Sequence, residues 1–107
     1  KLMDNAYNIM KYQDFLNAEK ATMEVIQEKL DVLTRKRYDY YRFEHDIELT
    51  KVEIEKFYLP GDEAILKMKG IMRRQQVRVD FFAMCLSCLK QQGWNMKEWS
   101  QNERRGL

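Results

Sequence analysis

The chain has one strong interruption, Leu59-Pro60-Gly61-Asp62, and very few other residues that break a helix. Its 107 residues include one proline and four glycines, too few turn-forming residues for a protein of many short strands. Proline disfavours helical geometry in the residue before it, glycine favours a turn, and a following aspartate can cap a new helix. We therefore predict two long helices joined by a tight turn over residues 59–62.

Apolar residues recur at helical spacing before this turn and predict a first helix over about residues 4–58, with a possible break near residue 17. Steps of three, four or seven residues place them on one face of a helix, whereas strand alternation does not fit. The remaining face mixes charges of both signs, as on a solvated helix. The predicted seam consists of Phe15, Thr22, Ile26, Leu33, Tyr40, Ile47, Ile54 and Tyr58.

The second helix is predicted over about residues 62–92, with Gly93 ending it and a short final helix over 95–104. A second apolar stripe, Val77, Phe81, Met84 and Cys88, opens on its later half. The three-four spacing of the main seam is of the heptad type and is interrupted only by a glutamine. This seam consists of Ile65, Met68, Met72, Gln75, Val79, Phe82, Leu86 and Leu89.

These features predict an all-α protein: one domain over residues 1–107, built on a long antiparallel helical hairpin of coiled-coil type with a short C-terminal helix. At about 1.5 Å rise per residue, the second helix covers only about residues 29–58 of the first. The apolar residues before that range, and the second apolar stripe, are left without a partner. Either the early residues fold back as a third helix, or another copy of the chain or another protein covers them. We expect self-association, as a homodimer, to complete the fold.

The amino-acid composition limits which partners the protein is expected to bind and in which cellular compartment it is expected to lie. Lys and Arg number 19 against 17 Asp and Glu, a net charge of +2 that is unlike a strongly basic nucleic-acid-binding tail. No run of about 18 apolar residues is present, so a transmembrane helix is not expected. The two cysteines form a poor disulfide framework and suit a reducing, cytoplasmic compartment.

Cys85 and Cys88 have the C-x-x-C spacing of redox and metal sites. A structural zinc site needs four ligands, and the chain offers two cysteines and one distant histidine, His45. A redox pair needs its thiolate stabilised at a helix N-terminus, whereas this pair falls late in an apolar helix. We interpret both cysteines as core residues and His45 as a packing residue. No catalytic residue, metal ligand or cofactor is predicted, and the chain is not expected to be an enzyme.

A basic stretch is the clearest candidate for a binding surface. Residues 64–79 contain five positive charges and no negative one, a pattern that suits phosphates, an anionic membrane surface or an acidic protein. Pairing with Glu48, Glu53 and Glu55 across the hairpin is the alternative. The five residues are Lys67, Lys69, Arg73, Arg74 and Arg78.

Residues 35–43 also interleave basic and aromatic side chains, as platforms for single-stranded nucleic acid do. On a helix this pattern disperses: Arg35 and Arg42 fall on the charged face, while Tyr40 and Phe43 point into the seam. We interpret this segment as a helix packed on two sides.

Three functions remain open. The first is a non-catalytic protein-interaction, assembly or regulatory module whose contact residues are Trp94, Met96 and Trp99, since aromatic residues and methionine are enriched in interface cores. The second is a nucleic-acid-binding regulator that uses the basic stretch. The third is a membrane-surface helical dimer.

Overall fold

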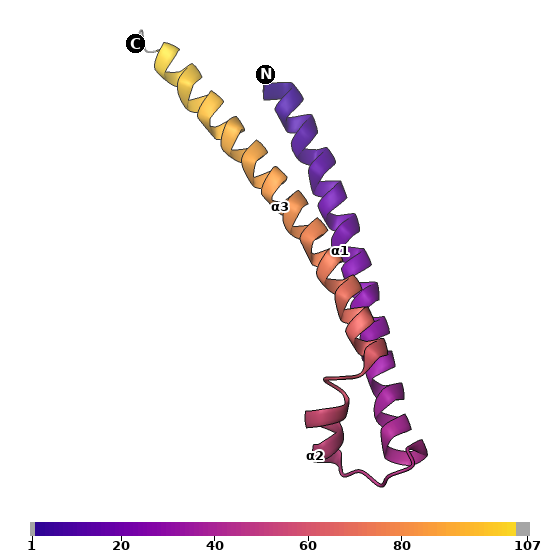
Figure 1. Ribbon diagram of the computed structural model, residues 1–107. Coiled ribbons are helices and arrows are strands. Elements are labelled where there is room, and N and C mark those ends of the chain that lie inside the picture. The colour runs from indigo at the N-terminus through magenta and orange to yellow at the C-terminus, as the bar shows by residue number, and fades with distance from the viewer. Residues whose placement is uncertain (1, 105–107) are drawn as a thin grey trace. The chain divides into compact units, whose positions relative to one another are not determined.

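The computed structural model describes the backbone of residues 2–104 and the side chains of residues 4–92. The described chain contains helices and no strand, which confirms the all-α prediction (Figure 1). In chain order the elements are α1 (Leu2–Asp39), the π-helix η1 (Tyr40–Glu44), α2 (Lys51–Glu53), the π-helix η2 (Ile54–Tyr58) and α3 (Glu63–Arg104).

The described residues divide into two compact units. Unit 1 combines residues 2–20 with 77–104, and unit 2 comprises residues 21–76. Each unit pairs a part of α1 with a part of α3.

The seam of α1 follows a heptad register that differs from the predicted one. Ile26 and Leu33 are on the seam as predicted, but Phe15 and Thr22 are exposed. Polar residues occupy several seam positions, and this hides the register from an apolar pattern. Buried or half-buried positions recur along α1 in alternating steps of four and three: Asn5, Ile9, Tyr12, Leu16, Glu19, Met23, Ile26, Leu30, Leu33 and Arg37.

The predicted seam of α3 is confirmed at all eight positions, each of which is buried or half-buried. Gln75, which interrupts the apolar pattern, is itself buried. The regular three-four spacing of apolar side chains fixes this register because each step returns to the same side of the helix.

Unit 1 gives the beginning of α1 a partner. The Asn5 amide donates a hydrogen bond to the backbone oxygen of Leu89 (Nδ2–O 3.1 Å), and the ring centroids of Tyr12 and Phe82 lie 6.2 Å apart. The expectation that residues before 29 lack a partner is therefore wrong. It assumed that the second helix stops near residue 92 and pairs with residues 29–58, whereas α3 is longer and meets an earlier part of α1.

The first helix is also shorter than predicted. It runs unbroken through Asn17, but the chain leaves helical geometry at His45, which has extended backbone (φ −72°, ψ 144°). Helix α2 then begins after Thr50, whose hydroxyl accepts a hydrogen bond from the Glu53 amide at 3.2 Å. Thr50-x-x-Glu53 has the sequence pattern of a capping box, a signal for a helix start that the apolar spacing concealed, although the Glu53 carboxylate accepts from the Thr50 hydroxyl (2.9 Å) and not from its backbone amide.

Burial in unit 2 explains why the chain bends here. A continuous helix over residues 40–58 would place Ile47 on the seam, but Ile47 is exposed. Leu49 is buried instead, and Ile54 is fully buried. The bend thus buries Leu49 where a continuous helix would have buried Ile47, while Ile54 is buried as predicted.

The turn over residues 59–62 is confirmed, with one difference. Leu59 keeps helical geometry (φ −63°, ψ −43°) despite preceding Pro60, and its amide donates to the Ile54 oxygen at 2.9 Å. The bias against helix before proline is a preference, and this i→i−5 hydrogen bond opposes it. Asp62 caps α3 as predicted, because its Oδ1 accepts from the Ile65 amide at 3.1 Å.

The predicted stop at Gly93 and the separate final helix over 95–104 are wrong, since α3 continues to Arg104. Glycine inside a helix costs only about 1 kcal/mol relative to alanine. The helix-favouring residues around it, Lys90 to Gln92 before and Met96 to Glu98 after, compensate for such a cost.

Candidate functional site

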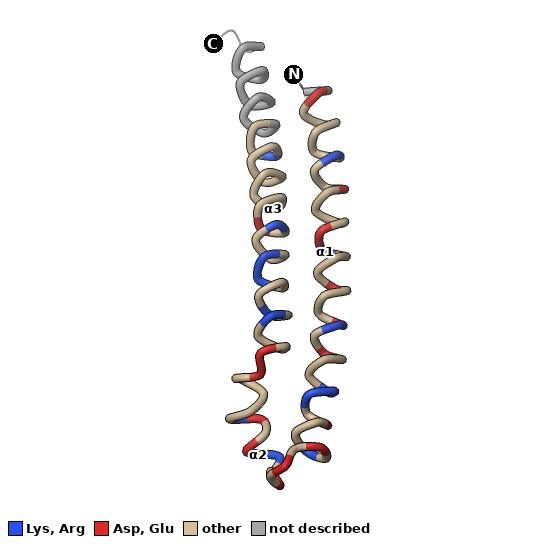
Figure 2. The backbone as a smooth tube through the Cα atoms, turned by 45° about the vertical axis from the view of Figure 1, so that its right-hand side comes forward, with Lys and Arg blue, Asp and Glu red and all other residues tan. Residues whose placement is uncertain are grey.

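The five residues of the basic stretch are all exposed on α3. Lys67, Lys69, Arg73 and Arg74 belong to unit 2 and Arg78 to unit 1. Figure 2 shows the basic positions following one another along α3. At about 100° per residue, Lys67 and Arg74 fall on one side of the helix, and Lys69 and Arg73 fall on the other.

The four basic residues of unit 2 form no ion pair with any residue whose side chain is described. In particular, the alternative pairing with Glu48, Glu53 and Glu55 is not present among the described side chains, and Glu53 instead accepts a hydrogen bond from Thr50. These four cations are therefore available for an anionic partner.

Arg78 differs from the other four because it binds Glu19 through two hydrogen bonds, Nη2–Oε1 at 2.7 Å and Nε–Oε2 at 3.1 Å. Its side chain remains 61% exposed, whereas that of Glu19 is only 16% exposed. The hydrogen bonds to Glu19 raise the pKa of Arg78. This pair joins α1 to α3 within unit 1, so Arg78 is already engaged by a carboxylate.

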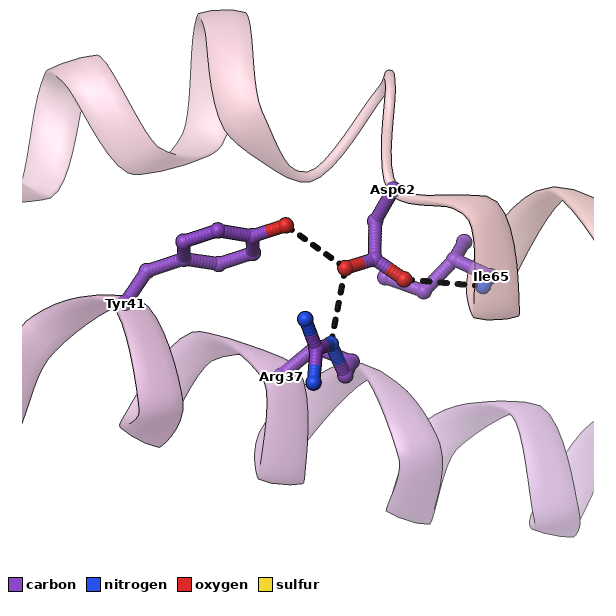
Figure 3. Close-up of polar contacts among 4 residues, drawn as sticks. All are labelled: Arg37, Tyr41, Asp62 and Ile65. Atoms are coloured by element: carbon purple, nitrogen blue, oxygen red, sulfur yellow. Dashed lines mark hydrogen bonds and ion pairs between the residues drawn. The ribbon is translucent and has the colours of Figure 1, made fainter. Parts of the chain in front are cut away.

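A buried carboxylate holds the start of α3 against the end of α1 in unit 2 (Figure 3). Asp62 Oδ2 accepts hydrogen bonds from Arg37 Nε and Tyr41 Oη, both at 2.7 Å, while its Oδ1 caps the helix. The Asp62 side chain is 2% exposed. The Arg37 guanidinium also lies over the rings of Tyr40 and Tyr41, at 4.5 and 5.2 Å from their centroids.

The same contacts set the ionisation of these groups. Burial alone would raise the pKa of Asp62, but hydrogen bonds from Tyr41, Arg37 and the Ile65 amide outweigh it and lower that pKa below its ordinary value. The hydrogen bond to Asp62, together with burial, raises the pKa of Tyr41. Asp62 is thus anionic and Tyr41 neutral at ordinary pH. Sequence reasoning identified Asp62 as a cap but missed its two side-chain partners, which lie 21 and 25 residues earlier.

A polar groove of about 510 Å³ lies next to this cluster in unit 2. Lys67 is the only member of the basic stretch among its lining residues. The groove therefore has Lys67 of the basic stretch on one wall and Arg37, at the end of α1, on another. The groove is lined by Arg37, Tyr41, Gly61, Asp62, Glu63, Ala64 and Lys67.

The aromatic and basic segment over residues 35–43 is more exposed than predicted. Phe43 does not point into a seam but is 77% exposed, and Phe57 of η2 is 72% exposed. Arg35, Lys36 and Arg42 are exposed as well. Phe43 also lies off the observed seam register, which continues from Leu33 and Arg37 to residues 40 and 44. Unit 2 therefore presents both cations and aromatic rings to solvent.

The cysteines are not the buried core residues that the sequence indicated. Cys85 is half-buried and Cys88 is exposed, and both are free thiols. The main seam buries Leu86, which turns the stripe of Phe81, Met84 and Cys88 outwards. His45 packs among the rings of Tyr40, Tyr41 and Tyr58, as expected of a packing residue.

Among the residues whose side chains are described, no group of three or more His, Cys, Asp and Glu could hold a metal ion. None of the described helices combines the length and the apolar character needed to cross a membrane. The side chains of Trp94, Met96 and Trp99 lie outside the described residues.

Comparison with known proteins identifies a family. The model of the UvsY family, described as "Recombination, repair and ssDNA binding protein UvsY", matches residues 2–105, which is nearly the whole chain. No curated protein and no solved structure matches the chain.

Proposed function

Because the chain belongs to the UvsY family, we propose that it is a non-catalytic protein that binds single-stranded DNA in recombination and repair. The family description favours the nucleic-acid alternative over a module that binds only proteins. It names DNA and not a membrane, so it lends no support to a membrane-surface dimer.

The observation that carries this proposal is the set of four exposed, unpaired cations on α3 of unit 2. Lys67, Lys69, Arg73 and Arg74 follow one another within two helical turns, and residues 64–79 contain no carboxylate that would compete for them. Neutralising phosphates releases condensed counterions, and this release supplies most of the affinity of a binder without sequence preference. Arg78 contributes less, because Glu19 already holds its guanidinium.

Exposed aromatic rings supply the second requirement of a single-strand binder. Phe43 and Phe57 are among the most exposed large apolar side chains of unit 2. Stacking of a base on such a ring is worth about 1–3 kcal/mol and is open to single strands, whose bases are not paired. We propose that these two rings give preference for single-stranded over double-stranded DNA.

Fluorescence anisotropy with a labelled oligothymidine tests the proposal. Lys67→Ala combined with Arg74→Ala is expected to weaken binding and to reduce the slope of log affinity against log salt by about 0.7 for each phosphate that is no longer neutralised. The matched control is Lys20→Ala with Lys90→Ala, which removes the same charge from exposed lysines outside the stretch. Equal losses in both double variants would reject the basic stretch as the site.

A second set of variants tests whether the exposed aromatic rings contribute to DNA binding. Phe43→Ala and Phe57→Ala are expected to weaken binding of oligothymidine and to leave the slope of the salt dependence unchanged, because stacking releases no counterion. Phe15→Ala alters a phenylalanine of unit 1 and serves as the control. Loss of affinity for single- and double-stranded DNA alike would contradict a role in strand preference.

Self-association also remains part of the proposal. Val77, Phe81, Met84 and Cys88 form an exposed apolar stripe on α3 of unit 1, which a second copy would cover. Labelling of Cys88 by a thiol reagent is expected to be fast in dilute protein and to slow as concentration rises, while light scattering reports a growing mass. A labelling rate independent of concentration would contradict burial of this stripe. Trp94, Met96 and Trp99 are proposed as further contact residues.

A further inference from the structure

Unit 2 carries a second groove that the proposed function does not use. It has a volume of about 460 Å³ and lies beside the seam, where a side of α1 meets Met68 of α3. No aromatic side chain is among its lining residues. The lining consists of Val25, Glu28, Lys29, Val32, Leu33, Lys36 and Met68.

The floor of this groove is aliphatic. Val25 and Val32 of α1 are 49% and 43% exposed, and Leu33 and Met68 are half-buried members of the two seams. Val25 and Val32 are seven residues apart, which corresponds to two turns or about 10.5 Å along α1. This spacing suits apolar anchors placed at i, i+3, i+4 and i+7 on a docked helix.

The rim of the groove is basic. Lys29 and Lys36 line it, are exposed, and form no ion pair with any residue whose side chain is described, while Glu28 is its only acidic lining residue.

We propose that this groove binds an acidic amphipathic helix of a partner protein. The aliphatic side chains of the partner helix pack on Val25 and Val32, and its carboxylates pair with Lys29 and Lys36. An aliphatic floor suits the apolar face of a helix, whereas DNA bases stack on aromatic rings, which the groove lacks. Charge complementarity with the lysines orients the helix and selects acidic partners. This inference goes beyond DNA binding and does not depend on it.

The test uses a fluorescein-labelled peptide of about 18 residues, with leucines at helical i, i+3, i+4 and i+7 positions and glutamate and alanine elsewhere. A peptide of the same composition with its leucines scattered round the helix is the control ligand. The full chain is expected to bind the amphipathic peptide at least tenfold more tightly than the scattered one. Equal binding of both peptides would reduce the interaction to charge alone and overturn the proposal.

Variants then locate the site. Val32→Glu and, separately, Lys29→Glu with Lys36→Glu are expected to weaken peptide binding about tenfold. Val52→Glu introduces the same charge at another exposed valine of unit 2 and is expected to leave it unchanged. Circular dichroism confirms that each variant is folded. Unchanged peptide binding in folded Val32→Glu would overturn the assignment.

Two further measurements distinguish a partner helix in the groove from DNA and from a second copy of the chain. Oligothymidine affinity is expected to be unchanged in Val32→Glu, and a parallel loss would assign the groove to DNA instead. The mass from light scattering is also expected to be unchanged, and a fall would assign the groove to contacts between copies of the chain. Peptide binding that persists when oligothymidine does not bind at all would leave this proposal standing and reject the proposed function.

Discussion

Arg37 Nε lies 2.7 Å from Asp62 Oδ2 and thereby ties the end of α1 to the first residue before α3. The carboxylate is almost fully buried, and the arginine is about one-third exposed. A charged hydrogen bond of this kind contributes more to stability than a neutral one. Removing one group of the pair is costly, because the other is then left buried without a hydrogen-bond partner.

Replacement of Asp62 is expected to destabilise unit 2. Asp62→Asn keeps an oxygen that can cap α3 but removes the charge that pairs with Arg37, and we expect a loss of about 2 kcal/mol in the free energy of unfolding. Asp62→Ala also removes the cap and should cost about 1 kcal/mol more. Urea unfolding followed by circular dichroism at 222 nm measures both. Equal stability of Asp62→Asn and the unmodified chain would contradict the role of the ion pair.

Stability should depend on pH at both ends of the range. Because the folded-state pKa of Asp62 is lowered, its contribution is present above the ordinary value of 3.8 and is lost as the pH falls through the lower folded value. The raised pKa of Tyr41 acts in the opposite direction: its contribution is present below 10.0 and is lost as the pH rises through the higher folded value. In Tyr41→Phe the alkaline loss is expected to weaken while the acid loss persists, as measured by urea unfolding across pH.

The capping box at Thr50 is expected to hold the bend between η1 and α2. Thr50→Ala removes the hydroxyl that accepts from the Glu53 amide and should cost about 1 kcal/mol, whereas Thr50→Ser keeps the hydroxyl and should cost little. Hydrogen exchange at the amides of residues 51–54 gives a local measurement. Identical exchange in both variants would contradict the cap.

Release of Arg78 should strengthen DNA binding. Glu19→Gln removes the carboxylate that holds the guanidinium, and we expect the affinity for oligothymidine to rise roughly twofold to fivefold with a steeper salt dependence. Glu24→Gln removes the same charge from an exposed residue of α1 and serves as the control. A gain of equal size in the control would assign the effect to net charge alone.

Gly70 offers a substitution that should stabilise the protein without altering its charges. A Cβ at this position would meet the Arg73 guanidinium at 3.8 Å, an ordinary van der Waals distance. Gly70→Ala is therefore expected to add about 0.5–1 kcal/mol to the free energy of unfolding. Oligothymidine affinity should be unchanged, because the basic residues around Gly70 are retained. A loss of stability would show that the backbone at this position needs glycine.

The sequence by itself determined the helical class, the turn at Pro60 and Gly61, the cap at Asp62 and the register of α3. These features depend on local chemistry or on an apolar pattern interrupted only at Gln75, so neighbouring residues suffice to define them. It also identified the basic stretch, because a charge run is visible without a fold. Heptad register on α1 was harder to read, since Asn5, Glu19 and Arg37 occupy seam positions that an apolar pattern assigns elsewhere.

Only the tertiary structure decided which charges are free and which apolar residues are covered. Arg78 and Lys67 look alike in the sequence, yet Glu19, 59 residues earlier, pairs with one of them and not the other. Ile47 and Ile54 repeat at the same helical spacing, yet one is exposed and the other fully buried, because the chain bends after His45. Pairing and burial of this kind depend on contacts between distant segments, and those contacts arise only when the chain has folded.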